Sequence, residues 1–141
     1  MAGYSGTPLL QKLGIKTGMR VVTVGAPRNY RKLLGKPPSG VEFSTRLGNN
    51  LEFIHCFVIQ RSDLEKQLPR LRTKVRDDGT LWISWPKKSA GVPTDVTEDV
   101  IRAVALPLGL VDTKVCAINE TWSGLKLMIR RENRGTKNFL K

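Results

Sequence analysis

Basic residues that directly follow a buried segment of this chain could bind an anion. Lys87 and Lys88 come after 81–85, an apolar run with a single serine, which is closed by Pro86. Such a run is typical of a strand that is buried on both faces, as in parallel sheets. Ligands of open parallel sheets bind outside the carboxyl ends of the strands, so the two lysines are expected at a ligand site.

Polar and aromatic residues that follow the other predicted strands are expected at the same edge of the sheet. Cations, an aromatic ring and helix N-termini together suit an anionic and planar ligand, such as a nucleotide-like group. The competing interpretation is a solvated rim of loops with chance positive charges. The predicted ligand-binding residues are Arg28, Tyr30, Arg61, Lys87, Lys88, Trp122 and Ser123.

No residue of the sequence is assigned a catalytic role. Asp95 and Glu98 could form a general acid/base pair, but their spacing is that of a helix capping box, which favours a structural role. Lys87 could act as a nucleophile only if it were buried, and otherwise offers a point charge to phosphate or carboxylate. His55 lies in an apolar run without a second histidine, so we expect a hydrogen-bonded core residue and no metal site.

The tryptophans and cysteines are mostly expected in the core. Trp82 and Trp85 should lie on opposite faces of their strand, because side chains alternate along a strand. Trp122 is harder to explain by packing, since it lies in a predicted turn. Cys56 and Cys116 each lie in an apolar run and are interpreted as reduced core thiols.

Strands and helices must alternate along the chain to position these residues. We predict strands at 19–24, 41–43, 51–59, 81–85, 111–118 and 125–130, and helices at 7–14, 27–34, 62–75 and from 95 to about 106. This order implies right-handed crossovers and a mostly parallel sheet covered by helices on both faces. The last two strands alternate in polarity and are joined by a short turn, which predicts an antiparallel hairpin.

Local signals refine this prediction. Ser62 with Glu65, and Asp95 with Glu98, match the capping box of a helix start. Pro69 is expected to kink or shorten its helix. The segment 77–79, Asp-Asp-Gly, is expected to be a turn. In the strand 111–118, strict alternation predicts Asp112 and Lys114 on the same face.

Length and charge set further bounds. The chain has 141 residues, and we expect one domain over 1–132 and a basic, flexible tail over 133–141. No apolar run is long enough to span a bilayer and no signal peptide is recognised, which predicts a cytoplasmic protein. Lys and Arg total 24 against 12 acids, a formal net charge of +12, so nucleic acid is an alternative partner.

Several motifs resemble known families. The segment 14–21, Gly-Ile-Lys-Thr-Gly-Met-Arg-Val, looks like the entry to the first strand of S-adenosylmethionine-dependent methyltransferases, which also end their sheet with an antiparallel hairpin. The segments 4–8, 85–88, 94–98 and 122–126 resemble an uncharacterised bacterial domain-of-unknown-function family. The resemblance implies an α/β, Rossmann-like fold of reduced methyltransferase architecture. It makes S-adenosylmethionine the cofactor to consider, but it carries no established activity.

The cofactor side departs from the methyltransferase pattern. The turn 24–30 holds one glycine where this class uses several, and Pro27 removes an amide donor. An acid normally ends the second strand to hold the ribose hydroxyls, whereas here Glu42 lies early in that strand. The segment 44–50 is too short for a further helix and strand, so this side of the fold is predicted to be truncated.

The favoured function is therefore a methyltransferase-like domain that binds an anionic small molecule or nucleotide-like ligand at the carboxyl edge of the sheet, without ordinary methyl transfer. Two alternatives stay open. One is an S-adenosylmethionine-dependent methyltransferase with a degenerate cofactor loop. The other is a nucleic-acid-binding protein that acts through a basic surface.

Overall fold

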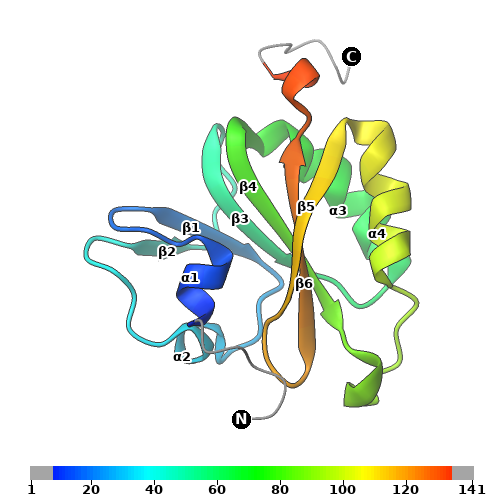
Figure 1. Ribbon diagram of the computed structural model, residues 1–141, viewed down its shortest axis with the longest axis horizontal. Coiled ribbons are helices and arrows are strands. Elements are labelled where there is room, and N and C mark those ends of the chain that lie inside the picture. Colours follow the sequence, from blue (N-terminus) through cyan, green and yellow to red (C-terminus); the bar gives the residue numbers. More distant parts are fainter. Residues whose placement is uncertain (1–7, 135–141) are drawn as a thin grey trace.

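Residues 8–134 form a six-stranded sheet at the centre of the molecule, with helices on both of its faces (Figure 1). The structure is a computed structural model and describes residues 8–134. The strands are β1 (Arg20–Val24), β2 (Glu42–Ser44), β3 (Leu51–Phe57), β4 (Val75–Pro86), β5 (Leu110–Ala117) and β6 (Trp122–Ile129). The helices are α1 (Leu9–Leu13), α2 (Tyr30–Leu34), α3 (Arg61–Lys74) and α4 (Glu98–Ala105), with short 3-10 turns η1 (Lys88–Ala90), η2 (Leu106–Leu108) and η3 (Arg131–Asn133).

The strand order is β2-β1-β3-β4-β6-β5. Strands β1 to β4 are mutually parallel, whereas β6 runs antiparallel to both β4 and β5. This confirms the predicted α/β class with a mostly parallel sheet and a C-terminal antiparallel hairpin. It also places the carboxyl ends of β1 to β4 at one edge of the sheet. Strand β2 is the outermost strand, next to β1.

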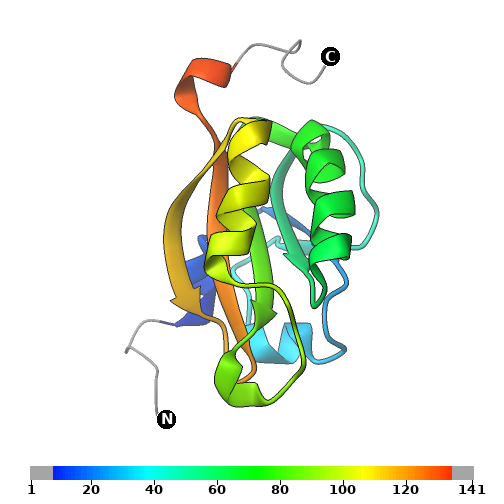
Figure 2. The same ribbon diagram turned by 90° about the vertical axis from the view of Figure 1, so that its right-hand side faces the viewer.

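Two hydrophobic layers enclose the sheet. Helices α3 and α4 lie side by side on one face, as Figure 2 shows, and their apolar side chains pack with Trp85. Helices α1 and α2 pack on the other face, together with Trp82 and Phe53. The two tryptophans of β4 therefore lie on opposite faces, as alternation predicts. Residues 81–86 are all buried, which confirms a strand covered on both sides.

Strand β4 is longer than the sequence indicated. The segment 77–79, expected to be a turn, lies inside β4. The pairing between β3 and β4 shifts register between Leu51 and Phe53. This irregularity accommodates extra residues of β4, including the polar segment 77–79. A Cβ on Gly79 would approach the Leu51 carbonyl oxygen to 2.9 Å, so this glycine allows the two strands to come close.

The capping box predicted at Ser62 and Glu65 is wrong. Helix α3 begins at Arg61, and Gln60 occupies its N-cap position without a side-chain hydrogen bond. The cap comes from a distant part of the chain, because the Asp95 carboxylate accepts a hydrogen bond from the Arg61 backbone N–H at 2.6 Å. Glu65 instead forms an ion pair with the Arg61 side chain at 3.1 Å.

The capping box predicted at Asp95 and Glu98 is also wrong. Helix α4 begins at Glu98, and Thr97 is its N-cap, with Oγ1 accepting a hydrogen bond from the Val100 N–H at 3.2 Å. Glu98 pairs with Arg102 one turn along the same helix. The Asp95 carboxylate is engaged at α3. Each carboxylate therefore has its own structural partner, and the two do not form an acid/base pair.

Two further local expectations are corrected. Pro69 does not shorten helix α3, which continues to Lys74 because Leu64, Leu68 and Leu71 hold it against the core. A kink at Pro69 stays a prediction. Strand β5 has a register shift between Asp112 and Lys114, so these residues do not share a face.

Some of the remaining expectations concern residues outside 8–134. The Thr7 helix cap, the motif at residues 4–7 and residues 135–141 of the predicted tail lie outside them. Within residues 8–134, no helix is long and apolar enough to cross a membrane.

Candidate functional site

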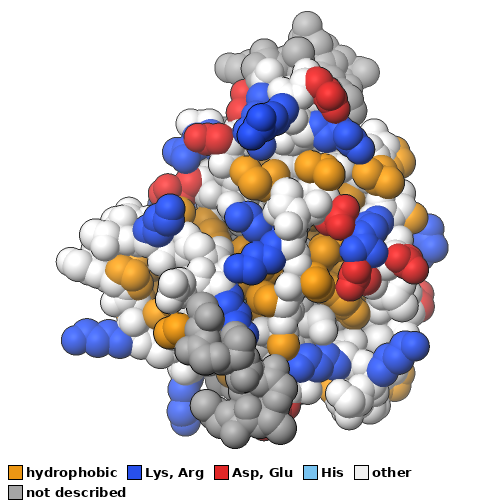
Figure 3. All heavy atoms as spheres, viewed as in Figure 1, with side chains coloured by type: hydrophobic (Ala, Val, Ile, Leu, Met, Phe, Trp, Pro, Cys, Tyr) orange, Lys and Arg blue, Asp and Glu red, His pale blue; other side chains and the backbone are white. Residues whose placement is uncertain are grey.

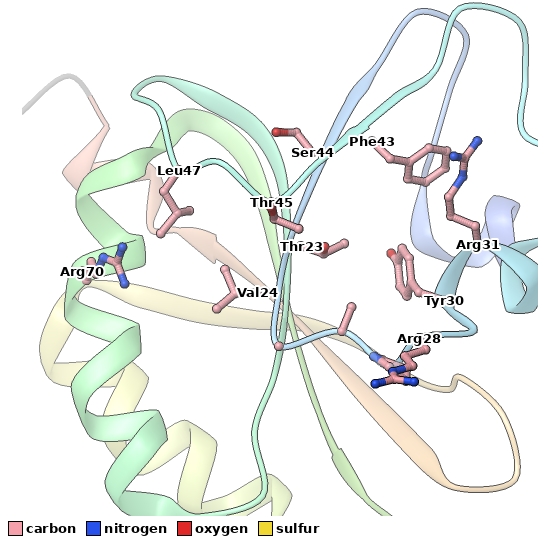
Figure 4. A pocket seen from close by; sticks show the side chains of 13 residues that line it. Thr23, Val24, Arg28, Tyr30, Arg31, Phe43, Ser44, Thr45, Leu47 and Arg70 are labelled. Carbon is pink, nitrogen blue, oxygen red and sulfur yellow. The ribbon is translucent and has the colours of Figure 1, made fainter.

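A broad pocket of about 910 Å³ opens at the carboxyl end of β1, beside the outer strand β2 (Figure 4). Arg70 reaches toward it from α3 on one side, and Arg28 and Arg31 lie on the other side, at α2. The lining residues are Thr23, Val24, Gly25, Ala26, Pro27, Arg28, Tyr30, Arg31, Phe43, Ser44, Thr45, Leu47 and Arg70. The crevice at the carboxyl ends of the strands is where open α/β sheets bind ligands.

The charge of this arginine pocket is of one sign. Its lining, drawn wholly from described residues, includes Arg28, Arg31 and Arg70 but no carboxylate. The Arg31 guanidinium lies over the Phe43 ring, 4.7 Å from the ring centroid, which is a cation–π contact. The arrangement offers planar hydrogen-bond donors, which match the geometry of phosphate and carboxylate groups.

The single glycine of the first turn is required by packing. Gly25 has a φ of +68°, and a Cβ at this position would approach the Phe57 carbonyl oxygen to 2.9 Å. An L side chain would be strained both by its backbone conformation and by this contact. A glycine is therefore needed at this position because strand β3 lies close to the backbone of the turn.

The second strand ends without an acid at the pocket. Glu42 is the first residue of β2 and lies opposite Arg20, the first residue of β1. Ser44 ends the strand and Thr45 follows it, and both line the pocket. This confirms the expectation that Glu42 lies early in its strand and leaves hydroxyl groups where a ribose-binding carboxylate would be expected.

Tyr30 lines the pocket and belongs to a buried hydrogen-bond network. Its hydroxyl lies 2.9 Å from His55 Nδ1, and His55 Nε2 lies 2.7 Å from Ser84 Oγ. The His55 ring also stacks on Phe57, with the centroids 4.3 Å apart. Burial lowers the pKa of His55 to about 3 and raises the pKa of the Tyr30 phenol well above its ordinary value. His55 is thus the neutral, hydrogen-bonded core histidine that the sequence predicted.

The predicted site residues are only partly brought together. Arg28 and Tyr30 line the arginine pocket. The others belong to the same carboxyl edge but lie outside its lining. Arg61 is at the start of α3 and pairs with Glu65. For Arg61, Lys87, Lys88, Trp122 and Ser123, a role in ligand binding stays a prediction.

The two lysines after β4 lie where that strand leaves the sheet. The Lys87 backbone N–H donates to the Thr121 carbonyl at 2.8 Å, which ties the strand exit to the start of β6. Lys87 is half-buried, and Lys88 is exposed at the start of η1. Neither ammonium group forms an ion pair with a carboxylate of residues 8–134.

Packing accounts for Trp122. Its ring meets Phe57 edge to face, with centroids 5.0 Å apart and an interplanar angle of 88°. Trp122 is half-buried and packs against the core under α1 and α2. Ser123 pairs with Trp85 of β4 and Ala117 of β5 within the sheet.

Solved structures of methyltransferases share this architecture. A candidate type 11 methyltransferase from Sulfolobus solfataricus superposes with a TM-score of 0.59 at 14% identity, over 86% of this chain and 89% of that chain. The ribosomal protein L11 methylase of Lactobacillus delbrueckii subsp. bulgaricus gives 0.54 at 10%, over 87% and 76%. The magnesium protoporphyrin IX methyltransferase of Synechocystis PCC 6803, solved with bound S-adenosylmethionine, gives 0.52 at 12%, over 86% and 74%.

The chain has a Rossmann-like methyltransferase fold. At these identities the likeness shows the fold alone. No family model and no curated protein matches the chain, so the resemblance to an uncharacterised bacterial family stays a prediction.

The methyltransferase-like pocket of this chain does not fit S-adenosylmethionine well. The only glycine of its first turn serves the contact with β3, and Pro27 has no N–H to offer. Ser44 and Thr45 replace the acid expected at the end of β2. Residues 8–134 also contain no group of three or more His, Cys, Asp or Glu side chains that could hold a metal ion.

Sequence reasoning missed several pocket residues. Ser44 and Thr45 could have been found, because they follow the second predicted strand. Arg70 could not, since it lies in the third turn of α3 and reaches the pocket only through the packing of that helix on the sheet.

Proposed function

We propose that the arginine pocket binds a small anionic ligand with a phosphate or similar group and a planar part, and that the protein does so without ordinary methyl transfer. The observation that carries this proposal is the charge of the pocket. Three guanidinium groups line it and no carboxylate does. A cavity lined by one sign of charge concentrates counterions of the opposite sign.

The guanidinium groups of the pocket are available to bind an anionic ligand. Arg28, Arg31 and Arg70 form no ion pair with a carboxylate of residues 8–134. The Arg70 guanidinium donates one hydrogen bond within the described part of the chain, from Nη1 to Gln67 Oε1 at 3.3 Å. Each guanidinium can donate two parallel hydrogen bonds to a phosphate. An anion would therefore replace water around guanidinium groups that no carboxylate of residues 8–134 neutralises.

The pocket also offers flat surfaces. The Phe43 ring carries the Arg31 guanidinium, and Tyr30 presents a second aromatic side chain. Stacking on such groups favours a planar ligand such as a nucleobase. Hydroxyl groups of Ser44 and Thr45 at the end of β2 can hydrogen-bond sugar hydroxyls or phosphate oxygens. These features support a nucleotide-like ligand.

The lining argues against acid–base chemistry. It holds no carboxylate, histidine or cysteine that could take a proton from a substrate. The Tyr30 hydroxyl is hydrogen-bonded to His55, and burial disfavours its ionised form. We therefore place binding ahead of catalysis. S-adenosylmethionine remains the competing ligand, because methyltransferases of this fold are seen with it.

The test is calorimetric titration with inorganic pyrophosphate, ADP and S-adenosylmethionine. We expect ADP to bind with a Kd below about 1 mM, equivalent to about −4 kcal/mol, and more tightly than S-adenosylmethionine. The double variant Arg28→Gln, Arg70→Gln should weaken ADP binding by roughly 1–3 kcal/mol, because charge-assisted hydrogen bonds are lost.

A matched control removes the same charge elsewhere. Arg20 and Arg131 are exposed, at the start of β1 and in η3, and do not line the pocket. Arg20→Gln, Arg131→Gln should leave ADP affinity near wild type. The proposal fails if none of the three probes binds, if S-adenosylmethionine binds more tightly than ADP, or if both double variants lose affinity equally.

A further inference from the structure

Residues 8–134 cover the sheet face that carries α1 only in part. The Trp82 indole N–H donates to the Leu13 carbonyl at the end of α1, at 3.0 Å, so this helix ends over β4. Across the sheet, Trp82 lies opposite Lys126 of β6, and Lys126 lies opposite Lys114 of β5. In Figure 1 no helix of residues 8–134 lies over β5 and β6 on this face.

Four lysines gather on this uncovered area, which we call the lysine face: Lys12, Lys16, Lys114 and Lys126. Lys114 and Lys126 are directly opposite each other on neighbouring antiparallel strands. The Lys114 ammonium donates to the Lys12 carbonyl at 3.1 Å, which brings the end of α1 to β5. Lys16 follows α1, and, in addition to partial burial, its positive charge is near enough to lower the pKa of Lys126.

Within residues 8–134, three of these lysines are not neutralised by an acidic side chain. Lys16, Lys114 and Lys126 form no ion pair with a carboxylate of residues 8–134. Partial burial lowers the pKa of Lys126, and the positive charges of Lys114 and Lys16 lower it further. In Figure 3, Lys and Arg side chains lie in the middle of this face, whereas most of the visible Asp and Glu side chains lie toward α4, along the upper rim or at the left of the view.

The register shift in β5 removes the nearest acid. Strict alternation would put Asp112 on the same face as Lys114. The shift instead sets Asp112 opposite Leu127, whose side chain packs in the α3 and α4 layer. There the Asp112 carboxylate accepts a hydrogen bond from Arg102 Nε at 2.9 Å. The bulge thus leaves a purely basic row on the open face.

Like charges directly opposite each other on paired strands are destabilising, so this arrangement costs stability when no anion is bound. We propose that the lysine face binds the phosphate backbone of nucleic acid. Lysines are compact point charges that suit phosphate oxygens in many orientations. Phosphate contacts carry no sequence information, so binding should be independent of sequence.

Two features favour nucleic acid over a membrane. The lysines come from two strands and from the end of α1, so their charge is spread over a surface, as a polyanion backbone requires. Met128 and Cys116 on the same face are half-buried and do not protrude as interfacial anchors do. The proposal does not rest on the arginine pocket, because the two sets of residues do not overlap.

The test is fluorescence anisotropy of a labelled DNA duplex and a labelled RNA single strand, titrated between about 50 and about 200 mM salt. For wild type we expect log Kobs to fall linearly with log salt. The triple variant Lys16→Gln, Lys114→Gln, Lys126→Gln should bind at least about tenfold more weakly at low salt. Its slope on duplex DNA should be smaller by about 2.7, or about 0.9 for each lost phosphate contact.

The matched control is Lys32→Gln, Lys36→Gln, Lys66→Gln, which removes the same charge from exposed positions of α2, the following loop and α3. It should keep affinity and slope near wild type. Equal losses in both triple variants would show that only diffuse net charge acts, and would overturn the proposal. So would the lack of wild-type binding at low salt, or stronger binding to phosphatidylserine vesicles than to nucleic acid.

Lysine footprinting of the wild type avoids any effect of the substitutions on folding. An amine-reactive reagent and mass spectrometry report which lysines the DNA duplex protects. We expect protection of Lys16, Lys114 and Lys126, and full reactivity of Lys32 and Lys66. Protection of Lys32 and Lys66 in their place would overturn the proposal.

Discussion

Burial of His55 makes the stability of this protein depend on pH. The side chain is fully buried, and both of its ring nitrogens are hydrogen-bonded, to Tyr30 and Ser84. Its pKa is about 3 in the folded protein, against the ordinary 6.5 that applies when the chain is unfolded. Between these two values the unfolded chain binds a proton that the folded protein does not. The contribution of neutral His55 to the free energy of unfolding is therefore fully present above about pH 6.5, and it is lost as the pH falls toward about 3.

The magnitude follows from the two pKa values. From about pH 7 to about pH 5, protonation of the unfolded chain should lower the free energy of unfolding by about 2 kcal/mol. Over the whole window the loss approaches about 5 kcal/mol. His55 is the single histidine of the chain, and carboxylates titrate mostly below this range, so the signal can be assigned to one side chain.

Urea denaturation followed by tryptophan fluorescence measures this dependence. The control is His55→Gln, which should be less stable than the wild type at about pH 7 but should lose most of the slope between about pH 5 and about pH 7. NMR of the wild-type imidazole gives an independent reading, and the folded protein should show no titration above about pH 5. A wild-type stability that differs by less than about 0.5 kcal/mol between these pH values, or an imidazole that titrates near its ordinary pKa, would refute the reasoning.

Two further substitutions test local features of the fold. Gly25→Ala should lower the free energy of unfolding by at least about 2 kcal/mol, because of its positive φ and its 2.9 Å approach to the Phe57 carbonyl. Gly91→Ala, with a similar φ but no atom within 4 Å, should cost only about 1 kcal/mol, and equal costs in urea denaturation would contradict the role of the contact. Thr97→Ala should cost about 1 kcal/mol by removing the cap at Val100 N–H, whereas Thr97→Ser should melt near wild type; an unchanged melting temperature in Thr97→Ala would show that the cap is not needed.

Signals within a few residues predicted the elements, but not their starting points. The apolar runs that became β3 and β4 and the helical spacing of Leu64, Leu68 and Leu71 were sufficient to find the strands and α3. The capping residue of α3 was misassigned, because Asp95 reaches it from 34 positions along the chain. A local pattern such as the capping box does not register a competing partner that only folding brings near.

The candidate site shows the same division. Arg28 and Tyr30 were predicted, because they directly follow the first strand and strand ends are where such sheets bind ligands. The pocket itself required knowledge that β2 is the outer strand and that Arg70 of α3 turns toward it. The lysine face likewise depends on where α1 ends over Trp82, which no spacing in the sequence specifies.

Local sequence patterns were sufficient to predict the α/β alternation, the buried strand at 81–85 and the shared edge where the parallel strands end. These follow from hydrophobic periodicity and chain direction, which are properties of short segments. Which charged side chains lie close together depends on the folded chain. The register shift that moves Asp112 away from Lys114 and the packing that brings Arg70 to the pocket are set by contacts between distant segments. Such contacts form only when the whole core packs, and for that reason they could not be predicted from local patterns.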